Sequence, residues 1–220
     1  MAIRAVLFDV YGTLLDVHSA IAREGRELGA QADSISRVWR QKQLEYSWVY
    51  SLRGEYRSFR DLTAAALDFA LVGRDASPSL RARLLQAYEH LTPYSDAVDA
   101  LAQLRGKGLR LTALSNGDPD MLETALASAG LRAHLDAVLS VSPLKVYKPD
   151  RRVYEMGRDW AGAAATDIAF VSSNAWDAGG AAAFGFRTFW INRSGQPTEY
   201  DISAKAGILG SLSDLTARLT

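Results

Sequence analysis

The sequence predicts an α/β fold, with a Rossmann-like doubly wound parallel sheet as its core and a helical cap inserted after the first strand. Short apolar runs that end in polar residues recur along the 220 residues, and helix-like segments separate them. One long block without strand alternation follows the first run. Near-continuous apolar runs that alternate with helices are typical of a parallel sheet that is covered on both faces and joined by right-handed crossovers.

The expected strands are, in chain order, residues 5–9, 109–116, 137–140, 168–174 and 187–192. Thr92 and Pro93 predict a helix that ends at Gly106, and Asp118 and Pro119 predict the start of the next one. Each of these pairs combines an N-cap residue with a proline in the first turn. Residues 207–220 are expected to form a short connection and a final helix.

The block of residues 16–91 has strong helical periodicity, and Ser58 and Asp61 have the spacing of a capping box. An insertion directly after the first strand emerges at the edge of the sheet where a ligand binds. There it can fold over the site as a lid that excludes water. The sequence therefore predicts a core domain of residues 1–15 and 92–220 and a cap domain of residues 16–91.

Composition narrows the range of partners. The 25 basic and 25 acidic side chains give a formal net charge of +0, so we expect no general attraction to nucleic acid or to a membrane surface, and small molecules are the expected partners. No apolar run approaches the about 18 residues of a membrane span, and the amino terminus resembles no secretion signal, so a cytoplasmic location is expected. The absence of cysteine excludes disulfides, thiolate metal sites and a cysteine nucleophile.

The first apolar run ends in a carboxylate, a glycine turn and a hydroxyl, at Asp9, Gly12 and Thr13. A carboxylate is ionised at neutral pH and can attack a substrate without a general base if the site removes its water and orients it. The alternative is an aspartate that caps the turn. In doubly wound sheets the ligand site lies beyond the carboxyl ends of the strands. This edge gathers Asp9, Ser115, Asn116, Ser172, Ser173 and Asn174.

Position 11 bears on the leaving group. Cleavage of a phosphate ester expels a basic alkoxide that benefits from protonation by a nearby acid, whereas this chain carries Tyr11 two residues after Asp9. Chloride, bromide or iodide leaves as a stable anion without such an acid. Tyr11 therefore argues against a phosphatase, although packing at the end of the strand would explain it as well.

Five motifs in order carry a resemblance to a known family. They are residues 8–13 with 16–19, 39–46, 114–117, 146–150 and 172–177. Together they resemble the haloacid dehalogenase superfamily, and specifically the L-2-haloacid dehalogenases, over nearly the whole chain. The resemblance implies hydrolysis of short 2-haloalkanoic acids, with a 2-haloacid as substrate and a halide as product. It further implies no metal or cofactor requirement and a homodimer.

The resemblance also assigns roles to individual residues. It implies that Asp9 is the nucleophile, with Thr13, Lys148, Tyr154 and Asp177 beside it. Ser172, Asn174 and Asp177 would bind and activate the hydrolytic water and hold Lys148. Arg40 would accept the halide with help from Asn116, and Ser115 would bind the substrate carboxylate together with backbone N–H groups after Asp9. The remaining substrate-binding residues would be Tyr11, Gln41, Leu44, Phe59 and Trp176.

Several of these residues have plainer interpretations from the sequence alone. Lys148 and Arg40 would both be solvated as ordinary surface cations, although Arg40 and Leu44 lie four residues apart and share a helix face. Asn174 and Asp177 have the spacing of a helix-capping pair, and Ser115 precedes a turn-forming Asn-Gly pair. Core packing is the alternative for the aromatic residues.

The predicted function is thus hydrolytic dehalogenation of short-chain L-2-haloalkanoic acids to D-2-hydroxyalkanoic acids through an aspartyl ester. The first alternative is a Mg²⁺-dependent phosphatase of the same fold that acts on small phosphate esters. Superfamily phosphatases hold the ion with acidic residues in the region of Asp177, but Ser172 and Asn174 contribute no charge here. The second alternative is a non-catalytic binding protein on this scaffold.

Overall fold

The computed structural model describes residues 3–74 and 76–219. Met1, Ala2, Asp75 and Thr220, which the predicted core and cap segments include, lie outside the described residues. A six-stranded sheet has the order β5-β4-β1-β6-β7-β8, and every neighbouring pair is parallel. Its strands are β1 (Ala5–Phe8), β4 (Arg110–Ser115), β5 (Ala137–Ser140), β6 (Ile168–Ser172), β7 (Arg187–Ile191) and β8 (Ala206–Leu209). The predicted doubly wound sheet is confirmed.

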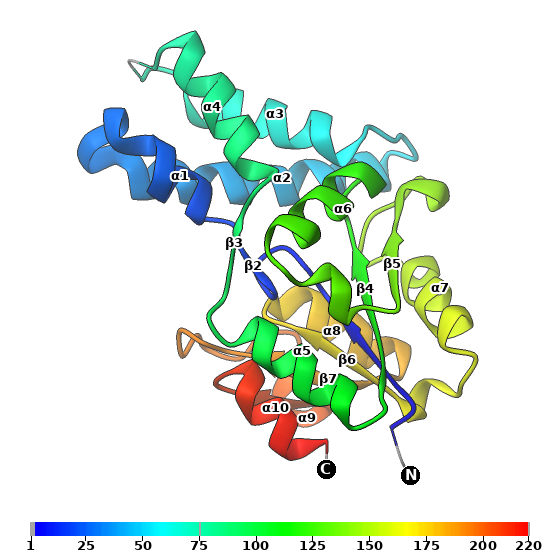
Figure 1. Ribbon diagram of the computed structural model, residues 1–220. Helices are drawn as coiled ribbons and strands as arrows, with labels where there is room; N and C mark the ends of the chain where they lie inside the picture. The colour runs from blue at the N-terminus through cyan, green and yellow to red at the C-terminus, as the bar shows by residue number, and fades with distance from the viewer. Residues whose placement is uncertain (1–2, 75, 220) are drawn as a thin grey trace.

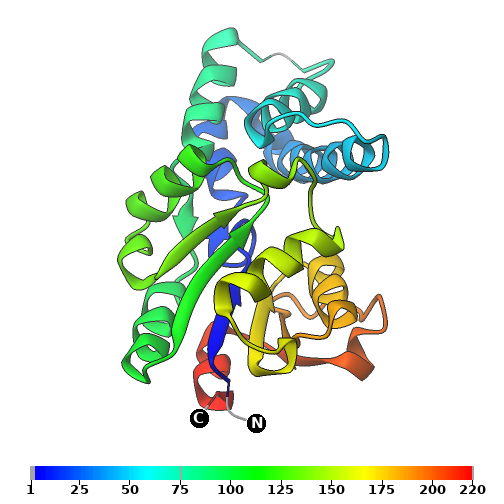
Figure 2. The ribbon, with the colours of Figure 1, turned by 90° about the vertical axis from the view of Figure 1, so that its right-hand side faces the viewer.

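Helices cover both faces of this sheet (Figure 2). One face carries α5 (Ala97–Gly106), α6 (Pro119–Ser128) and α10 (Leu212–Arg218), and the other carries α7 (Arg151–Ala161), α8 (Ala175–Phe184) and α9 (Ile202–Lys205). Short 3₁₀ turns η2 (Arg132–His134), η3 (Ser142–Leu144) and η4 (Ala165–Asp167) lie in the connections. The four residues of β1 are all fully buried, as expected for the central strand of a sheet that is covered on both sides.

Four helices lie together beyond the carboxyl ends of the strands (Figure 1). They are α1 (Ser19–Glu24), α2 (Ala32–Leu52), α3 (Phe59–Ala70) and α4 (Pro78–Tyr88), and the 3₁₀ helix η1 (Gly25–Gln31) joins the first two. We call these elements the cap. The two connections between cap and sheet form an antiparallel ribbon of β2 (Leu15–Asp16) and β3 (Thr92–Pro93). The helical insertion after the first strand is therefore present, over the edge of the sheet where it was predicted.

The helix starts predicted from proline have different outcomes. The one at Asp118 and Pro119 is confirmed as the start of α6. The one at Thr92 and Pro93 is wrong, because both residues belong to β3 and α5 begins only at Ala97. The residue before a proline favours extended backbone, and here the ribbon with Leu15 and Asp16 uses that preference. The pattern of an N-cap residue followed by proline thus marked a strand.

One strand of the sheet was not predicted. β8 lies at the edge of the sheet inside a segment that was expected to be a connection. It contains Gly207, and glycine weakens the sequence pattern of a strand. A side chain at this position would come within 2.9 Å of the Phe189 ring on β7, so glycine allows the edge strand to pack there. Across the part of the chain that the structure describes, no helix has the length and apolar character that a membrane crossing requires.

Candidate active site

Asp9 lies directly after β1, where a tight turn begins. Its backbone N–H donates to the Val171 carbonyl of β6, which fixes the residue between two parallel strands. The turn requires Gly12, whose φ of 90° lies in the region that favours glycine. A side chain at Gly12 would also contact the amide of Asn174 at 3.5 Å. The turn thus holds the Asp9 carboxylate at the carboxyl edge of the sheet, with 5% of the residue exposed.

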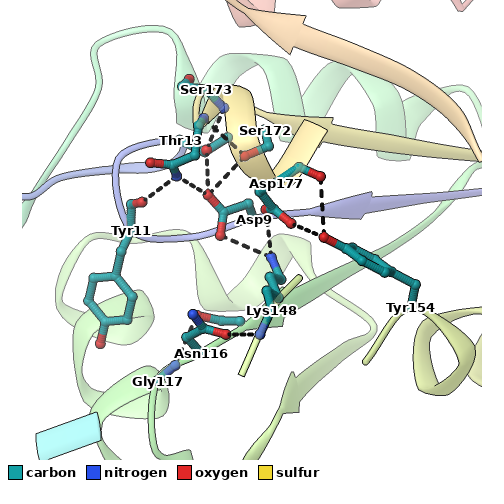
Figure 3. Close-up of polar contacts among 12 residues, drawn as sticks. Asp9, Tyr11, Thr13, Asn116, Gly117, Lys148, Tyr154, Ser172, Ser173 and Asp177 are labelled. Carbon is teal, nitrogen blue, oxygen red and sulfur yellow. Dashed lines mark hydrogen bonds and ion pairs between the residues drawn. The ribbon is translucent and has the colours of Figure 1, made fainter. Parts of the chain in front are cut away.

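The two carboxylate oxygens of Asp9 have different surroundings (Figure 3). Oδ2 accepts hydrogen bonds from Thr13 Oγ1 at 2.8 Å, Ser172 Oγ at 3.2 Å and Asn174 Nδ2 at 2.7 Å. Oδ1 accepts one from Lys148 Nζ at 3.1 Å. The turn of β1, the end of β6 and the start of α8 therefore converge on one carboxylate.

Lys148 is completely buried and lies between two carboxylates. Its Nζ atom is 3.1 Å from Asp9 Oδ1 and 2.9 Å from Asp177 Oδ2. The other Asp177 oxygen accepts a hydrogen bond from the Tyr154 hydroxyl at 2.9 Å. Asp177 is fully buried as well, so its two oxygens are held by Lys148 and Tyr154, and its carboxylate fixes the ammonium group next to Asp9.

Burial and charge act in opposite directions on these groups. Burial alone would raise the pKa of Asp9, but the Lys148 charge, the Thr13 hydrogen bond and the Arg40 charge outweigh it and hold the pKa below its usual value. Burial would lower the pKa of Lys148, but Asp177 and Asp9 together raise it. At Asp177 burial prevails over the Lys148 charge, and its pKa rises to about 6. At neutral pH the lysine is therefore charged between two carboxylates.

The residues that surround the Asp9 carboxylate form one cluster, which consists of Asp9, Thr13, Lys148, Ser172, Asn174 and Asp177. Arg40 reaches this cluster from helix α2 of the cap. Its Nη2 atom donates to the Tyr11 carbonyl at 3.0 Å and lies 3.4 Å from Asn174 Oδ1. Its Nη1 atom donates to Gln43 Oε1 at 2.8 Å. The sequence alternative of a solvated surface arginine is therefore wrong, and the guanidinium group lies beside the amide that binds Asp9.

The helix-capping alternative for Asn174 and Asp177 is also wrong. Asn174 occupies the N-cap position of α8, but its side chain makes no capping hydrogen bond to the helix. Its amide instead donates to Asp9 and, at 3.1 Å, to the Tyr11 carbonyl. The start of a helix thus supplies a polar side chain to the Asp9 cluster rather than to its own backbone.

Tyr11 has its backbone in the cluster and its ring outside it. The carbonyl receives the Arg40 and Asn174 hydrogen bonds, whereas the ring points away from the Asp9 carboxylate (Figure 3). The ring packs against Phe59 and Tyr88, with centroid distances of 5.3 and 5.6 Å. Its hydroxyl is buried and has no hydrogen-bond partner among the described residues. Burial raises the pKa of this hydroxyl well above its usual value, so it is a poor proton donor.

The other predicted residues lie at varying distances from this centre. Ser115 is fully buried, and its hydroxyl accepts a hydrogen bond from the Gly117 N–H within its own turn. Asn116 accepts one from the Lys148 backbone N–H at 3.0 Å, which joins the loops after β4 and β5. Leu44 and Trp176 are half-buried, whereas Gln41 is exposed on α2.

One buried side chain that supports Arg40 was not predicted. Gln43 is fully buried, and besides Arg40 it binds the Tyr88 hydroxyl at 3.0 Å and the Thr63 hydroxyl at 2.6 Å. Positions three apart share a helix face, so its spacing from Arg40 was the signal available in the sequence. The neighbouring Gln41, which was predicted, faces outward instead.

The donor set around Asp9 does not fit a magnesium ion. Mg²⁺ prefers oxygen ligands in octahedral geometry, but here the Lys148 ammonium lies between the Asp9 and Asp177 carboxylates. Within residues 3–74 and 76–219, no group of three or more His, Cys, Asp or Glu side chains has an arrangement that could hold a metal ion. The positive charge beside Asp9 is thus supplied by a side chain.

Two cavities border the cluster. One of about 390 Å³ lies between α2 and the core and is lined by Trp48, Trp176, Tyr147 and Lys148 among others. A second, of about 210 Å³, is lined by Gly12, Arg40, Asn174 and Arg193 among others. The cluster therefore has space on the side of Lys148 and on the side of Arg40.

Comparisons with known proteins agree with this geometry. The family described as haloacid dehalogenase-like hydrolase matches residues 3–185. (S)-2-haloacid dehalogenase 4A of Burkholderia cepacia is 46% identical over 216 residues, which are 97% of this chain and 94% of the relative. A crystal structure of a dehalogenase is similar with a TM-score of 0.95 at 46% sequence identity, and the alignment covers 98% of this chain and 96% of the dehalogenase chain.

A further solved structure holds a covalent ligand. It is L-2-haloacid dehalogenase from Xanthobacter autotrophicus with chloropropionic acid covalently bound, with a TM-score of 0.89 at 37% identity over 98% of this chain and 97% of its own. The identities extend over nearly the full length of both partners in each comparison. The chain therefore belongs to the haloacid dehalogenase-like hydrolases and, among them, to the L-2-haloacid dehalogenases, the family that its five motifs predicted.

Proposed function

We propose that this protein hydrolyses short-chain L-2-haloalkanoic acids to D-2-hydroxyalkanoic acids through an ester on Asp9. The family assignment supports this proposal, and so does the covalently bound chloropropionic acid in the Xanthobacter relative. The observation that carries it is the pairing of Asp9 with Lys148 at the end of β1, together with a Tyr11 ring that points away from them. The carboxylate can attack, and the leaving group receives no proton.

In the first step, Asp9 Oδ1 attacks C2 of the substrate from the side opposite the halogen. Oδ1 is the better nucleophile, because Oδ2 already accepts three hydrogen bonds and Oδ1 accepts one. The new C–O bond forms as the carbon–halogen bond breaks, and the halogen leaves with the bonding electrons. Arg40, with Asn116, receives the halide. Attack from the opposite side inverts C2 and produces an aspartyl ester.

In the second step, water attacks the Asp9 carbonyl carbon. The negative charge then develops on Oδ2, where Thr13, Ser172 and Asn174 donate hydrogen bonds. Preorganised donors at a developing oxyanion are a major source of catalysis. The Lys148–Asp177 pair takes a proton from the water and returns one to the departing oxygen. The product keeps Oδ1, and the water oxygen remains in Asp9.

The walls around Asp9 set the substrate range in this proposal. Tyr11, Leu44, Phe59 and Trp176 form the apolar surface next to the substrate, with Gln41 at the outer edge of α2. Ser115 and the backbone N–H groups after Asp9 bind the substrate carboxylate. The division into a core of residues 1–15 and 92–220 and a cap of residues 16–91, the homodimer and the cytoplasmic location remain predictions.

The Mg²⁺-dependent phosphatase is not favoured. Its reaction expels a basic alkoxide that benefits from an acid near the nucleophile, but position 11 holds a tyrosine whose pKa is raised by burial. The Lys148 ammonium group already lies between Asp9 and Asp177, the two carboxylates that a metal ion at this site would use.

Halide release from L- and D-2-chloropropionate, measured with and without EDTA, tests the proposal. We expect chloride release from the L-substrate, D-lactate as the product and unchanged rates in EDTA. p-Nitrophenyl phosphate with added Mg²⁺ serves as the phosphatase substrate in the same series. Turnover of the phosphate ester without any halide release would overturn the proposal.

A further inference from the structure

Arg193 lies just after β7, at the same edge of the sheet as Asp9, and binds three different segments of the chain. Its Nη1 atom donates to Ser173 Oγ at 2.7 Å. Its Nη2 atom donates to the Thr13 carbonyl at 3.1 Å and to Asp96 Oδ1 at 3.1 Å. Its guanidinium carbon lies 4.0 Å from the centre of the Tyr94 ring. One side chain thus connects the turn after β1, the loop after β6 and the segment before α5.

Two of these contacts lead directly to the Asp9 carboxylate. Thr13 accepts a hydrogen bond from the Ser173 backbone N–H at 2.8 Å, and the same hydroxyl donates to Asp9 Oδ2 at 2.8 Å. Ser173 is followed by Asn174, whose amide donates to the same oxygen. Arg193 therefore holds the backbone of one donor and the neighbour of another.

An arginine suits this place for a geometric reason. The guanidinium group is planar and presents several N–H donors in fixed directions, which a lysine cannot reproduce. Asp96 holds the group in position, and its second oxygen is in turn held by the Leu212 N–H at 2.8 Å. The side chains of Arg193 and Asp96 are 22% and 15% exposed. An exposed ion pair alone contributes little to stability, but this pair is largely buried and directs its remaining donors at Thr13 and Ser173.

We propose that Arg193 is a positioning residue for the ester chemistry at Asp9, which rests on the proposed function. It fixes the turn after β1 against the loop after β6, so that the Thr13 and Asn174 donors stay directed at Asp9 Oδ2. These donors orient the carboxylate for attack and stabilise the charge that develops on Oδ2 during hydrolysis of the ester. Arg193 itself does not touch the substrate.

The test compares Arg193→Ala with wild type and with Arg187→Ala, an exposed arginine at the opposite end of the same strand. We expect kcat for bromide release from L-2-bromopropionate to fall about 10- to 100-fold in Arg193→Ala, since small misplacements of reacting groups have effects of this size. KM should change less than about twofold, because the contacts with the bound substrate remain. Arg187→Ala should behave as wild type, and thermal unfolding of all three proteins shows whether each is folded.

Chemical rescue distinguishes positioning from a general loss of structure. Methylguanidinium sulfate can enter the space left by the side chain, which borders the cavity of about 210 Å³, and bridge Thr13 and Ser173. We expect it to restore part of kcat in Arg193→Ala and to leave Arg187→Ala unchanged. Methylammonium sulfate, which cannot bridge both groups, should restore less. Arg193→Lys should resemble Arg193→Ala because the charge is kept but the planar fork is lost.

A double variant supplies the second check. If Arg193 acts through Ser173, the effects of Arg193→Ala and Ser173→Ala on kcat should be less than additive in the combined variant. A folded Arg193→Ala with the wild-type kcat, or a kcat that methylguanidinium and methylammonium restore equally, would overturn the inference. Failure of the proposed function would be seen in the wild type, because the wild type itself would then release no bromide.

Discussion

The two sides of the site are built differently. The active-site floor consists of six residues: Asp9, Thr13, Lys148, Ser172, Asn174 and Asp177. They come from the turn after β1, the end of β6, the start of α8 and the connection between β5 and α7. Most of them are buried and bind one another. The cap side consists of Arg40, Gln43, Leu44 and Phe59 on helices α2 and α3. Arg40 spans the boundary by hydrogen bonds to the Tyr11 carbonyl and Asn174.

This difference suggests a division of work in the proposed reaction. Groups that are buried and held by several partners keep one geometry, and bond formation at carbon depends on such alignment. A long side chain on a neighbouring helix is better suited to receive an anion that arrives and then leaves. We therefore assign attack and ester hydrolysis to the active-site floor, and departure of the halide and substrate choice to the cap side.

The largest expected effect is on the floor. Asp9→Asn removes the attacking oxygen while keeping the shape of the side chain, and we expect kcat to fall at least about 10⁴-fold, as for other nucleophiles. In wild type, a single turnover in ¹⁸O-water should place the label in Asp9 rather than in the 2-hydroxy acid, as read by mass spectrometry of the protein and product. Asp99→Asn, an exposed carboxylate on α5, is the matched control. Label in the product after one turnover would contradict the covalent step.

A smaller effect is expected on the cap side. Arg40→Lys keeps the positive charge but loses the planar group that joins Gln43, Tyr11 and Asn174, and we expect about a 10²-fold loss of kcat with 2-chloropropionate. The loss should shrink with 2-iodopropionate, because iodide needs less stabilisation as it leaves. Arg37→Lys, one turn earlier on α2 and exposed, is the control. Equal losses of kcat with 2-chloropropionate and 2-iodopropionate would show that Arg40 does not act in halide departure.

The smallest effect concerns the pH dependence of kcat, which distinguishes Asp177 from the other residues of the active-site floor. The pKa of Asp177 is raised to about 6 by burial, so it is ionised above pH 6 and takes up a proton as the pH falls through that value. Lys148 then loses one of its two carboxylate partners and binds Asp9 more strongly, which weakens the nucleophile. We expect kcat of wild type to fall below about pH 6 and this fall to vanish in Asp177→Asn, whose activity is lower by about tenfold throughout.

The control for this profile is Asp159→Asn, an exposed carboxylate on α7, which should keep the wild-type curve. Activity is expected to fall on the acid side because the pKa of Asp177 is raised, which brings protonation of this carboxylate into the measurable pH range. A fall near pH 6 that persists in Asp177→Asn would assign it to another group.

Local pattern and strand-end chemistry predicted much of this molecule. The core strands were recognised because each is an apolar run closed by a polar residue, and the contacts of Asp9 with Thr13, Ser172 and Asn174 follow from strand ends that meet at one edge. Lys148, Tyr154 and Asp177 lie where the family resemblance implied. Their roles in the reaction stay predictions.

What the sequence did not reveal depends on contacts between distant segments. Gln43 is buried because Arg40, Thr63 and Tyr88 meet around it, and this meeting requires the packing of α2, α3 and α4. β8 is a strand because β7 offers it an edge, and Thr92 pairs with Asp16 rather than capping a helix. No sequence feature distinguishes Arg193 from the other arginines, because its contacts with Thr13 and Ser173 form only in the folded chain.

The ribbon of β2 and β3 joins the two halves of the molecule at a single place. Both chain connections pass through it, and Leu14, just before β2, accepts a hydrogen bond from the Tyr94 N–H just after β3. Asp9 and Thr13 lie a few residues from this ribbon, whereas Lys148 belongs to the connection between β5 and α7. A tilt of the helical lid would therefore be transmitted to the nucleophile turn along the backbone. It would reach the lysine loop through the hydrogen bonds of Tyr147, whose backbone N–H donates to Ser51 Oγ and whose hydroxyl donates to the Arg57 carbonyl.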